Sequence, residues 1–293
     1  MKATIHTLVP WWAKIAAKMA LARLPIPMRA WHRLGLFVPG FMRDPDYAIG
    51  VFEAHWRRAG SPAAGFTYLE LGPGESLATA LVAWAYGARG GVLVDAGDFA
   101  VRDVASYRPL IERLAQNPRV RDVRELKELS SLDALLAKVG AEVRTDGLAG
   151  LKTLPSDSVD LVFSQAVLEH VPLADFAATA NELHRIQKPS GIGSHRVDFK
   201  DHLQGSLNNL RFSEATWEKP WFARRSGFYT NRLRFSAMRD AFTRAGFSVT
   251  VPEQNRWAAA PIPRSKIARP FRDLADDDLK TSGAVFLMTK DRR

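Results

Sequence analysis

The order of hydrophobic and polar positions predicts alternating strands and helices from residue 66 onward. Short apolar runs alternate with longer segments in which apolar residues recur every three or four positions. The predicted strands are Thr67–Leu71, Gly91–Asp95, Glu142–Thr145, Val159–Ser164, Ile192–Val197, Ser248–Pro252 and Ala284–Thr289. The predicted helices cover residues 76–87, 100–115, 130–139 and 173–187. Because this alternation builds βαβ units, we expect an α/β, Rossmann-like, doubly wound sheet that is mainly parallel.

The segment before the first strand has a different, purely helical spacing. Residues 11–24 and 45–59 both carry apolar groups three and four positions apart, and Gly60-Ser61-Pro62 then marks a boundary. A chain of 293 residues is long enough for one large core with additions. We therefore predict an N-terminal helical cap over residues 1–60 and one domain over residues 61–293.

A glycine-containing loop follows the first predicted strand. Gly72 and Gly74 allow a tight turn and a close approach of the backbone to a ligand, and Glu70 is able to accept hydrogen bonds from a cationic or hydroxylated group. Leu77 stands where the third glycine of a dinucleotide fingerprint would be. An acidic residue with two close glycines suits S-adenosylmethionine, which carries no phosphate, better than a pyrophosphate. Taken alone, the loop is equally typical of a structural β-to-α turn.

Polar residues also follow the other early strands, at the edge of the sheet where doubly wound folds bind ligands. They are Asp95 after the second strand, Asp146 after the third, and Ser164 with Gln165 at the fourth. Asp95 follows Glu70 at close to the ~20-residue offset of a carboxylate that holds ribose hydroxyls. Asp98 is a nearby competitor for this role.

Composition and charge narrow the class of protein. The chain has no cysteine, which excludes disulfides, thiolate metal sites and cysteine nucleophiles and favours a cytoplasmic location. The net charge is +10, and its excess lies in residues 1–60, with 9 basic and 3 acidic residues, and in residues 200–273, with 14 and 6. Such basic flanks suit an anionic substrate, nucleic acid or an acidic membrane surface, or are simply solvated.

Four segments together resemble the class I S-adenosylmethionine-dependent methyltransferases, in particular the methyltransferase type 11 branch. The segments are Tyr68–Gly74, Leu154–Ser164, Ala166–Val171 and Lys188–Gly191, in the family's order and spacing. The resemblance implies a seven-stranded sheet with the last strand antiparallel, and S-adenosyl-L-methionine across the tips of strands one to four. Two departures are Ser76, in place of a frequent third glycine, and Ser190, in place of the second glycine of a Pro-Gly-Gly turn.

The same resemblance implies roles for individual residues. The methionine end of the cofactor would lie against the loop, Asp95 would bind the ribose, and the adenine would lie beside the residues after strand three. The residues assigned to the cofactor in this way are Glu70, Gly72, Pro73, Gly74, Asp95, Asp146, Gly147 and Leu148, with Ser164 and Gln165 closing the methionine side.

Residues 200–235 have no counterpart in the minimal fold and are predicted to form a substrate lid inserted after strand five. Asp198 and His202 should emerge just past that strand, near the transferable methyl group. His202 with a carboxylate partner is a candidate general base, and His170, beside the helix opened by Pro172, is a second. Hydrogen bonding within the fold is the alternative for both histidines. We expect no metal, although His195, Asp198 and His202 would be its ligands.

These patterns predict methyl transfer to an oxygen or nitrogen of a small or glycan-type, anionic acceptor. The anionic acceptor is suggested by basic residues among aromatic ones in the insert, which are also typical of ordinary packing. One alternative is an RNA methyltransferase, which would explain a pI of 10.0, although the Asn/Asp-Pro-Pro-aromatic signature is missing. Another is a non-catalytic binding protein, or a peripheral membrane protein held by residues 1–24.

Overall fold

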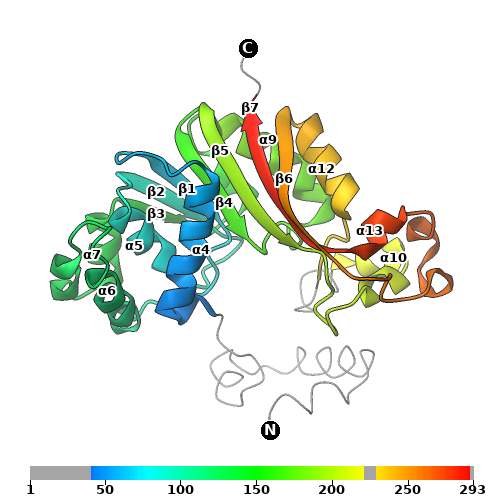
Figure 1. The fold of residues 1–293 in the computed structure, drawn as a ribbon, viewed down its shortest axis with the longest axis horizontal. Coiled ribbons are helices and arrows are strands. Elements are labelled where there is room, and N and C mark those ends of the chain that lie inside the picture. The colour runs from blue at the N-terminus through cyan, green and yellow to red at the C-terminus, as the bar shows by residue number, and fades with distance from the viewer. Residues whose placement is uncertain (1–40, 221–228, 291–293) are drawn as a thin grey trace, which may run out of the picture.

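The computed structural model describes residues 41–220 and 229–290. Its centre is a seven-stranded sheet in the order β3-β2-β1-β4-β5-β7-β6. Strands β1 to β5 are parallel, and β7 runs antiparallel to both of its neighbours, β5 and β6 (Figure 1). The strands are β1 (Thr67–Leu71), β2 (Gly90–Val94), β3 (Ala141–Arg144), β4 (Val159–Gln165), β5 (Gln187–Asp198), β6 (Phe247–Arg256) and β7 (Thr281–Lys290). The predicted fold class, including the antiparallel last strand, is confirmed.

Helices cover both faces of the sheet and enclose two cores. One core lies under α4, α5, α6 and α7, and the other under α8, α9 and α12. Successive residues of each strand alternate between them, so that Phe163 of β4 joins the first core and Val162 the second. The helices are α4 (Pro45–Arg58), α5 (Ala78–Ala85), α6 (Arg108–Ala115), α7 (Leu132–Lys138), α8 (Leu148–Lys152), α9 (Leu173–Ile186), α10 (Glu214–Trp217), α12 (Phe235–Arg244) and α13 (Asp276–Lys280).

Helix α4 packs directly on the sheet. The Asp44 carboxylate accepts hydrogen bonds from two backbone N–H groups of the first turn, and Pro45 supplies a fixed φ there. Ala48 and Phe52 are fully buried in the core that α5 also contributes to. The predicted helix at 11–24 lies outside the described residues, and the domain boundary at residue 60 stays a prediction.

Two elements differ from the sequence-based expectation. Strand β5 begins at Gln187 rather than near residue 192, because the buried Gln187 amide donates to the carbonyls of Gly191 and Met288 and so holds the irregular start of the strand against β7. Helix α12 was not predicted. Its buried residues Phe235, Met238 and Phe242 nevertheless have helical spacing and cover β6 and β7.

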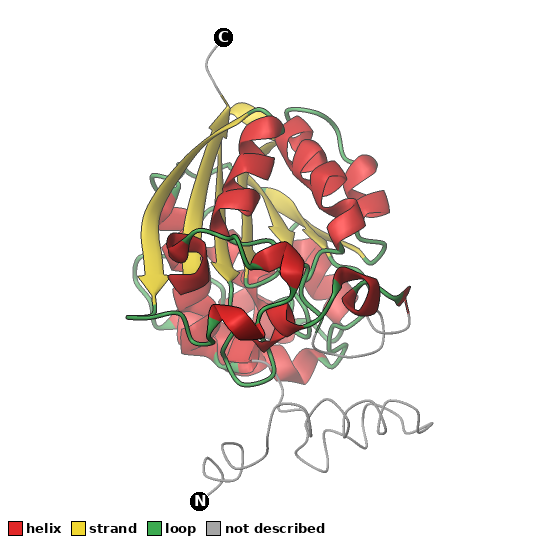
Figure 2. Ribbon diagram, turned by 90° about the vertical axis from the view of Figure 1, so that its right-hand side faces the viewer, coloured by secondary structure: helices red, strands yellow, loops and turns green. Residues whose placement is uncertain are grey.

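The insert after β5 does not stand alone. It packs against the β6–β7 connection in a small core, and Ala268 N–H donates to the Leu210 carbonyl at 2.8 Å. The short helices of this region include α10 and α13, and Figure 2 shows them gathered at one end of the sheet. The apolar residues of this core are Leu207, Leu210, Ile262, Ile267 and Leu279.

Two arginines of the insert are buried and contribute to its packing rather than to a basic surface. Arg234 is buried and donates to the carbonyls of Phe199, Asp278 and Thr281 at 2.6 to 3.1 Å. Arg232 donates to a carbonyl of the insert and lies over the Trp217 ring, with 5.4 Å from Cζ to the ring centroid. Of the two interpretations of these basic residues, the structure therefore supports packing for this pair.

Candidate active site

A cavity of about 620 Å³ lies beyond the carboxyl ends of β1 and β2. We call it the main cavity. The glycine loop forms one wall, the tip of β2 a second, and the starts of α8 and α9 the others. Among its lining residues are Gly72, Asp95, Asp146, Gly147, Leu148 and His170. Residues that the sequence analysis placed at three separate strand tips are thus brought together.

The glycine loop is tied to the tip of β2. Gly74, with a φ of 65°, donates its N–H to the Asp95 carboxylate at 2.8 Å. Gly72 has a φ of 72°, and a Cβ there would overlap the Val167 side chain. Both positions therefore need glycine. Gly74 needs it for its backbone conformation, and Gly72 needs it also because the loop after β4 packs closely against it.

Asp95 presents its carboxylate to the main cavity. One carboxylate oxygen accepts from Gly74, and the other accepts from Ala96 N–H at 2.6 Å. Burial raises the pKa of Asp95, and these two backbone donors oppose that shift. The group is partly buried and lines the main cavity, where its remaining lone pairs are able to accept hydrogen bonds.

The third wall depends on a turn at the start of α8. Gly147 has a φ of 56° and donates its N–H to the Asp95 carbonyl at 2.8 Å, which fixes the β3–α8 turn against β2. A Cβ on Gly150 would overlap the Asp146 carboxylate. Asp146, Gly147 and Leu148 therefore lie along the cavity as one short stretch of chain.

Five predicted cofactor residues, Glu70, Pro73, Gly74, Ser164 and Gln165, do not line the main cavity. Glu70 is buried and accepts a hydrogen bond from Thr79 of α5, and burial raises its pKa to about 8. Pro73 is buried within the loop. Ser164 and Gln165 lie at the end of β4 on opposite faces of the sheet, because strand side chains alternate.

The partners of Ser164 and Gln165 define these two faces. The Ser164 hydroxyl lies 2.8 Å from Nδ1 of His195, whose ring stacks on Phe242 of α12. Gln165 Oε1 lies 3.2 Å from Nε2 of His55, on α4. Ser164 is thus part of the core, and Gln165 lines a different cavity from the one that holds Asp95.

His170 lines the main cavity and has a defined tautomer. Its Nδ1 lies 2.8 Å from the Tyr229 backbone carbonyl, which only accepts, so Nδ1 carries the hydrogen. Nε2 of the neutral ring is then an unprotonated acceptor. The residue as a whole is exposed at the cavity, but partial desolvation of its ring lowers the pKa of His170, and the hydrogen bond to the carbonyl and the Asp198 charge oppose this shift. The ring is therefore neutral at pH 7, as a general base requires.

His202 and Asp198 lie beside His170. The exposed His202 ring stacks on the His170 ring, with centroids 4.7 Å apart and planes at 26°. Asp198 caps the next turn by accepting from Lys200 N–H at 2.9 Å, and it forms an ion pair with the Lys200 ammonium at 3.3 Å. Neither residue lines the main cavity.

Glu169, His170 and His202 offer three potential metal-ligand atoms within 4.8 Å of one another. An imidazole binds a metal along the lone pair in its ring plane, at about 2.0–2.1 Å. Two stacked rings hold these lone pairs in nearly parallel planes, which do not meet at a point close to both rings. We therefore assign no metal to this group. The other possible ligands, His195, Asp198 and His202, do not form one group, since His195 lies in the core against α12.

The buried carboxyl of Glu169 gives a prediction about stability. Burial, with the Asp198 charge adding to it, raises the pKa of Glu169 to about 8, so the folded state keeps a proton that the unfolded state loses above about 4.5. Stability should therefore fall as the pH rises from about 4.5 to 8. We expect Glu169→Gln to remove this loss, which is on the order of a few kcal/mol. Urea unfolding at pH 5 and pH 8 measures it, with the exposed Glu142→Gln as control. An unchanged pH dependence in Glu169→Gln would contradict the assignment.

Sequence reasoning missed several cavity residues, most notably Phe99. This side chain is 58% exposed, and among the described residues only one other large hydrophobic side chain, Tyr47 at 40%, is similarly exposed. Phe99 follows the tip of β2, and its ring lies over Gly97. A flat apolar group in the main cavity would cover it. No local pattern in the sequence distinguishes this phenylalanine from a buried one.

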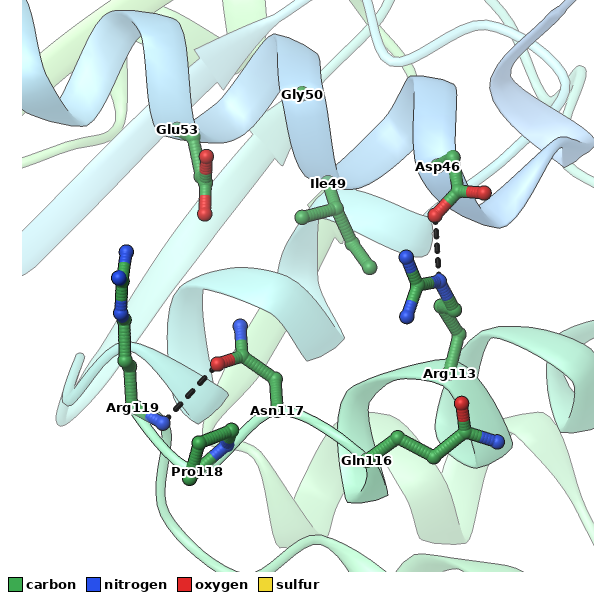
Figure 3. A pocket seen from close by; sticks show the side chains of 9 residues that line it. All are labelled: Asp46, Ile49, Gly50, Glu53, Arg113, Gln116, Asn117, Pro118 and Arg119. Carbon is green, nitrogen blue, oxygen red and sulfur yellow. Dashed lines mark hydrogen bonds and ion pairs between the residues drawn. The ribbon is translucent and has the colours of Figure 1, made fainter.

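A groove of about 500 Å³ between α4 and the loop after α6 is unrelated to the strand tips (Figure 3). Arg113 reaches Asp46 across it at 2.6 Å, and Arg119 N–H donates to the Asn117 side chain at 3.0 Å. No residue from a strand lines this groove. We call it the α4–α6 groove and assign it no chemistry.

Comparison with known proteins finds one family whose sequence model matches part of the chain. Residues 120–194 match the sequence model of the methyltransferase type 11 family, described as "Methyltransferase domain". A search of curated protein sequences gave no match. Residues 120–194 are thus similar to a methyltransferase domain, and the seven-stranded sheet with its antiparallel last strand is the one that this resemblance implies.

Several solved structures are similar in fold. One is the putative methyltransferase in complex with the Trm112 activator of Haloferax volcanii, with 19% identity, 86% of this chain and 96% of that chain covered, and a TM-score of 0.42. A putative sarcosine dimethylglycine methyltransferase from Galdieria sulphuraria has 14% identity, coverages of 84% and 87%, and a TM-score of 0.48. The 1,6-didemethyltoxoflavin-N1-methyltransferase of Burkholderia thailandensis has 14% identity, coverages of 90% and 86%, and a TM-score of 0.43.

Proposed function

We propose that the protein transfers a methyl group to an oxygen or nitrogen of a small, anionic acceptor, with S-adenosyl-L-methionine bound in the main cavity. The observation that carries this proposal is the convergence of the glycine loop, Asp95, the Asp146–Leu148 stretch and His170 around one cavity. The residues fit the cofactor. A half-buried carboxylate suits ribose hydroxyls, the exposed Phe99 ring suits a flat base, and the cavity is large enough for a nucleoside.

When bound, the cofactor supplies an electrophilic methyl group on a sulfonium. The chain contributes orientation, because holding the acceptor atom in line with the methyl group removes much of the entropic cost of the reaction. Asp95 would fix the ribose. The glycine loop and the α8 turn would shape the remaining walls. The roles of Glu70, Pro73, Gly74, Ser164 and Gln165 toward the cofactor stay predictions.

We assign proton removal to His170. The unprotonated Nε2 of His170 would accept the proton of the acceptor atom as that atom takes the methyl group that the cofactor would supply. The resulting imidazolium would be stabilised by the Asp198 charge, which already favours the protonated ring. His202 would hold the ring in place through the stack.

The remaining alternatives concern the acceptor and the location of the protein. None of the helices in the described part of the chain is long and apolar enough to span a bilayer. Contact with a membrane surface through residues 1–24 concerns residues outside the described ones. RNA as acceptor and a cytoplasmic location both stay predictions.

Calorimetry with S-adenosylmethionine and with S-adenosylhomocysteine tests the proposal. We expect both to bind with one site per chain. Labelled cofactor incubated with fractionated metabolites, glycans and RNA would then identify the acceptor class. Absence of binding to the folded protein would refute the assignment of the main cavity, and label in the RNA fraction alone would replace the small acceptor.

A further inference from the structure

A second cavity, of about 290 Å³, lies between α4 and the ends of β4 and β5. Its polar groups come from Arg58, Gln165, Arg196 and Asp46, and its apolar side comes from Tyr47, Val51 and Ala54. Tyr47 is the other large hydrophobic side chain, besides Phe99, that is exposed in the described part of the chain. The two exposed rings thus lie at two different cavities. This second cavity has an aromatic group, two cations and an amide within reach of one small ligand.

Gln165 is held in this cavity by a buried histidine. His55 is fully buried and lies 3.2 Å from Gln165 Oε1 through Nε2 and 2.8 Å from Ser194 Oγ through Nδ1. Because Oε1 only accepts, Nε2 carries the hydrogen, and Nδ1 accepts from the Ser194 hydroxyl. Burial lowers the pKa of His55 to about 4, so this arrangement holds at neutral pH. The amide nitrogen of Gln165 makes no hydrogen bond to the described residues and remains a donor for a ligand.

The charges around the cavity leave a cation without a full partner. Glu253 of β6 is the carboxylate shared by both arginines. It accepts from Arg58 Nε at 3.0 Å, whereas Arg196 is 3.7 Å away and makes no hydrogen bond to it. Asp46, which also borders the cavity, is bonded to Arg113. Two guanidinium groups therefore share one carboxylate, and an anion beside Arg196 would balance the second.

The second cavity and the main cavity are lined by residues that are close together in the chain at the end of β4. Gln165, which pairs with Arg196 across β4 and β5, lines the second cavity, and Val167, two residues further along, lines the main cavity. Two residues of chain span at most about 7 Å. A ligand bound to Gln165 would therefore lie close to a residue of the main cavity.

We propose that Arg58, Arg196 and the Gln165 amide bind a carboxylate or phosphate group of the methyl acceptor. This inference rests on the proposed function for the identity of the ligand as acceptor. The sequence suggested that the insert recognises the anion. Arg58 and Arg196, in contrast, lie on α4 and β5. Gln165 becomes an acceptor residue rather than a cofactor residue, with His55 as its positioning residue.

Titration with inorganic phosphate and with succinate tests this site, on the free protein and on the protein saturated with S-adenosylhomocysteine. We expect at least one probe to bind the wild type, and the stronger of the two identifies the anionic group. Arg196→Gln and Gln165→Glu should each weaken binding by about tenfold or more, because a charge-assisted contact is lost or a repulsive carboxylate is introduced. Arg58→Gln should act in the same direction.

Arg119→Gln is the matched control, since it removes the same charge from the neighbouring α4–α6 groove (Figure 3). It should leave anion binding unchanged, and all variants should bind S-adenosylhomocysteine as the wild type does. Equal weakening in Arg119→Gln would indicate a general charge effect and overturn the proposal, as would no binding of either probe. Failure of S-adenosylhomocysteine to bind would refute the proposed function, while the anion titration of the free protein would still decide this inference.

Discussion

Replacing His170 with asparagine is expected to lower kcat by about 10²- to 10⁴-fold, the usual contribution of a positioned general base. The asparagine amide is able to keep the donor that Nδ1 provides to the Tyr229 carbonyl, 2.8 Å away, but it has no equivalent of Nε2. Proton removal from the acceptor would be lost while the loop geometry is preserved. The measurement is turnover with the identified acceptor, together with the affinity for S-adenosylhomocysteine, which should change little.

His202→Asn is the comparison for this variant, because sequence analysis alone favoured His202 as the base. We expect a much smaller loss, limited to the removal of the stacking contact. A large loss in His202→Asn with near-normal turnover in His170→Asn would reverse the assignment.

The pH dependence of kcat/KM provides an independent test of the same base. Partial desolvation of the ring lowers the pKa of His170 below its usual value of 6.5, so the decline of activity toward acid should lie below that pH. The Asp198 charge opposes this lowering. Asp198→Asn should therefore move the decline to still lower pH. An acid limb unchanged by this substitution would argue against His170 as the titrating group.

Replacing Asp95 with asparagine is expected to weaken S-adenosylmethionine binding by about 10- to 100-fold. Hydrogen bonds to a charged group contribute about 1.5–3 kcal/mol, and the substitution removes the charge that would hold the ribose hydroxyls. It also weakens the link to Gly74, which fixes the glycine loop at 2.8 Å. Calorimetry with cofactor and product measures the change, and circular dichroism verifies that the fold is kept.

Asp98→Asn is the control for Asp95, because sequence spacing alone did not separate the two carboxylates. Asp98 is exposed, forms an ion pair with Arg102 at 3.1 Å and does not line the main cavity. Its replacement should leave cofactor affinity within about twofold of the wild type. A loss in Asp98→Asn equal to that in Asp95→Asn would remove the special role of Asp95.

Local patterns in the sequence were sufficient for the sheet and for part of the site. Strand positions follow from short apolar runs, and the residues after β1, β2 and β3 meet because parallel strands end at one edge of the sheet. For this reason Gly72, Asp95 and the Asp146–Leu148 stretch were predictable. The glycines are required by positive φ angles that a local turn already imposes.

Contacts between distant segments decided the rest. His170 and His202 are 32 positions apart in the sequence, and only the packing of the insert stacks their rings and brings the Tyr229 carbonyl to Nδ1. Arg234 resembles a surface cation in the sequence. It is buried because three carbonyls from separate segments converge on its guanidinium.

The sequence by itself thus determined the fold class and one wall of the main cavity, since these depend on periodicity and on residues close together in the chain. The tertiary structure decided which histidine lines the main cavity and which arginines remain available. It also showed that Ser164 and Gln165, adjacent in sequence, lie on opposite faces of the sheet. These outcomes depend on which residues of α4, α12 and the insert pack against each side chain, and a local sequence pattern does not contain that information.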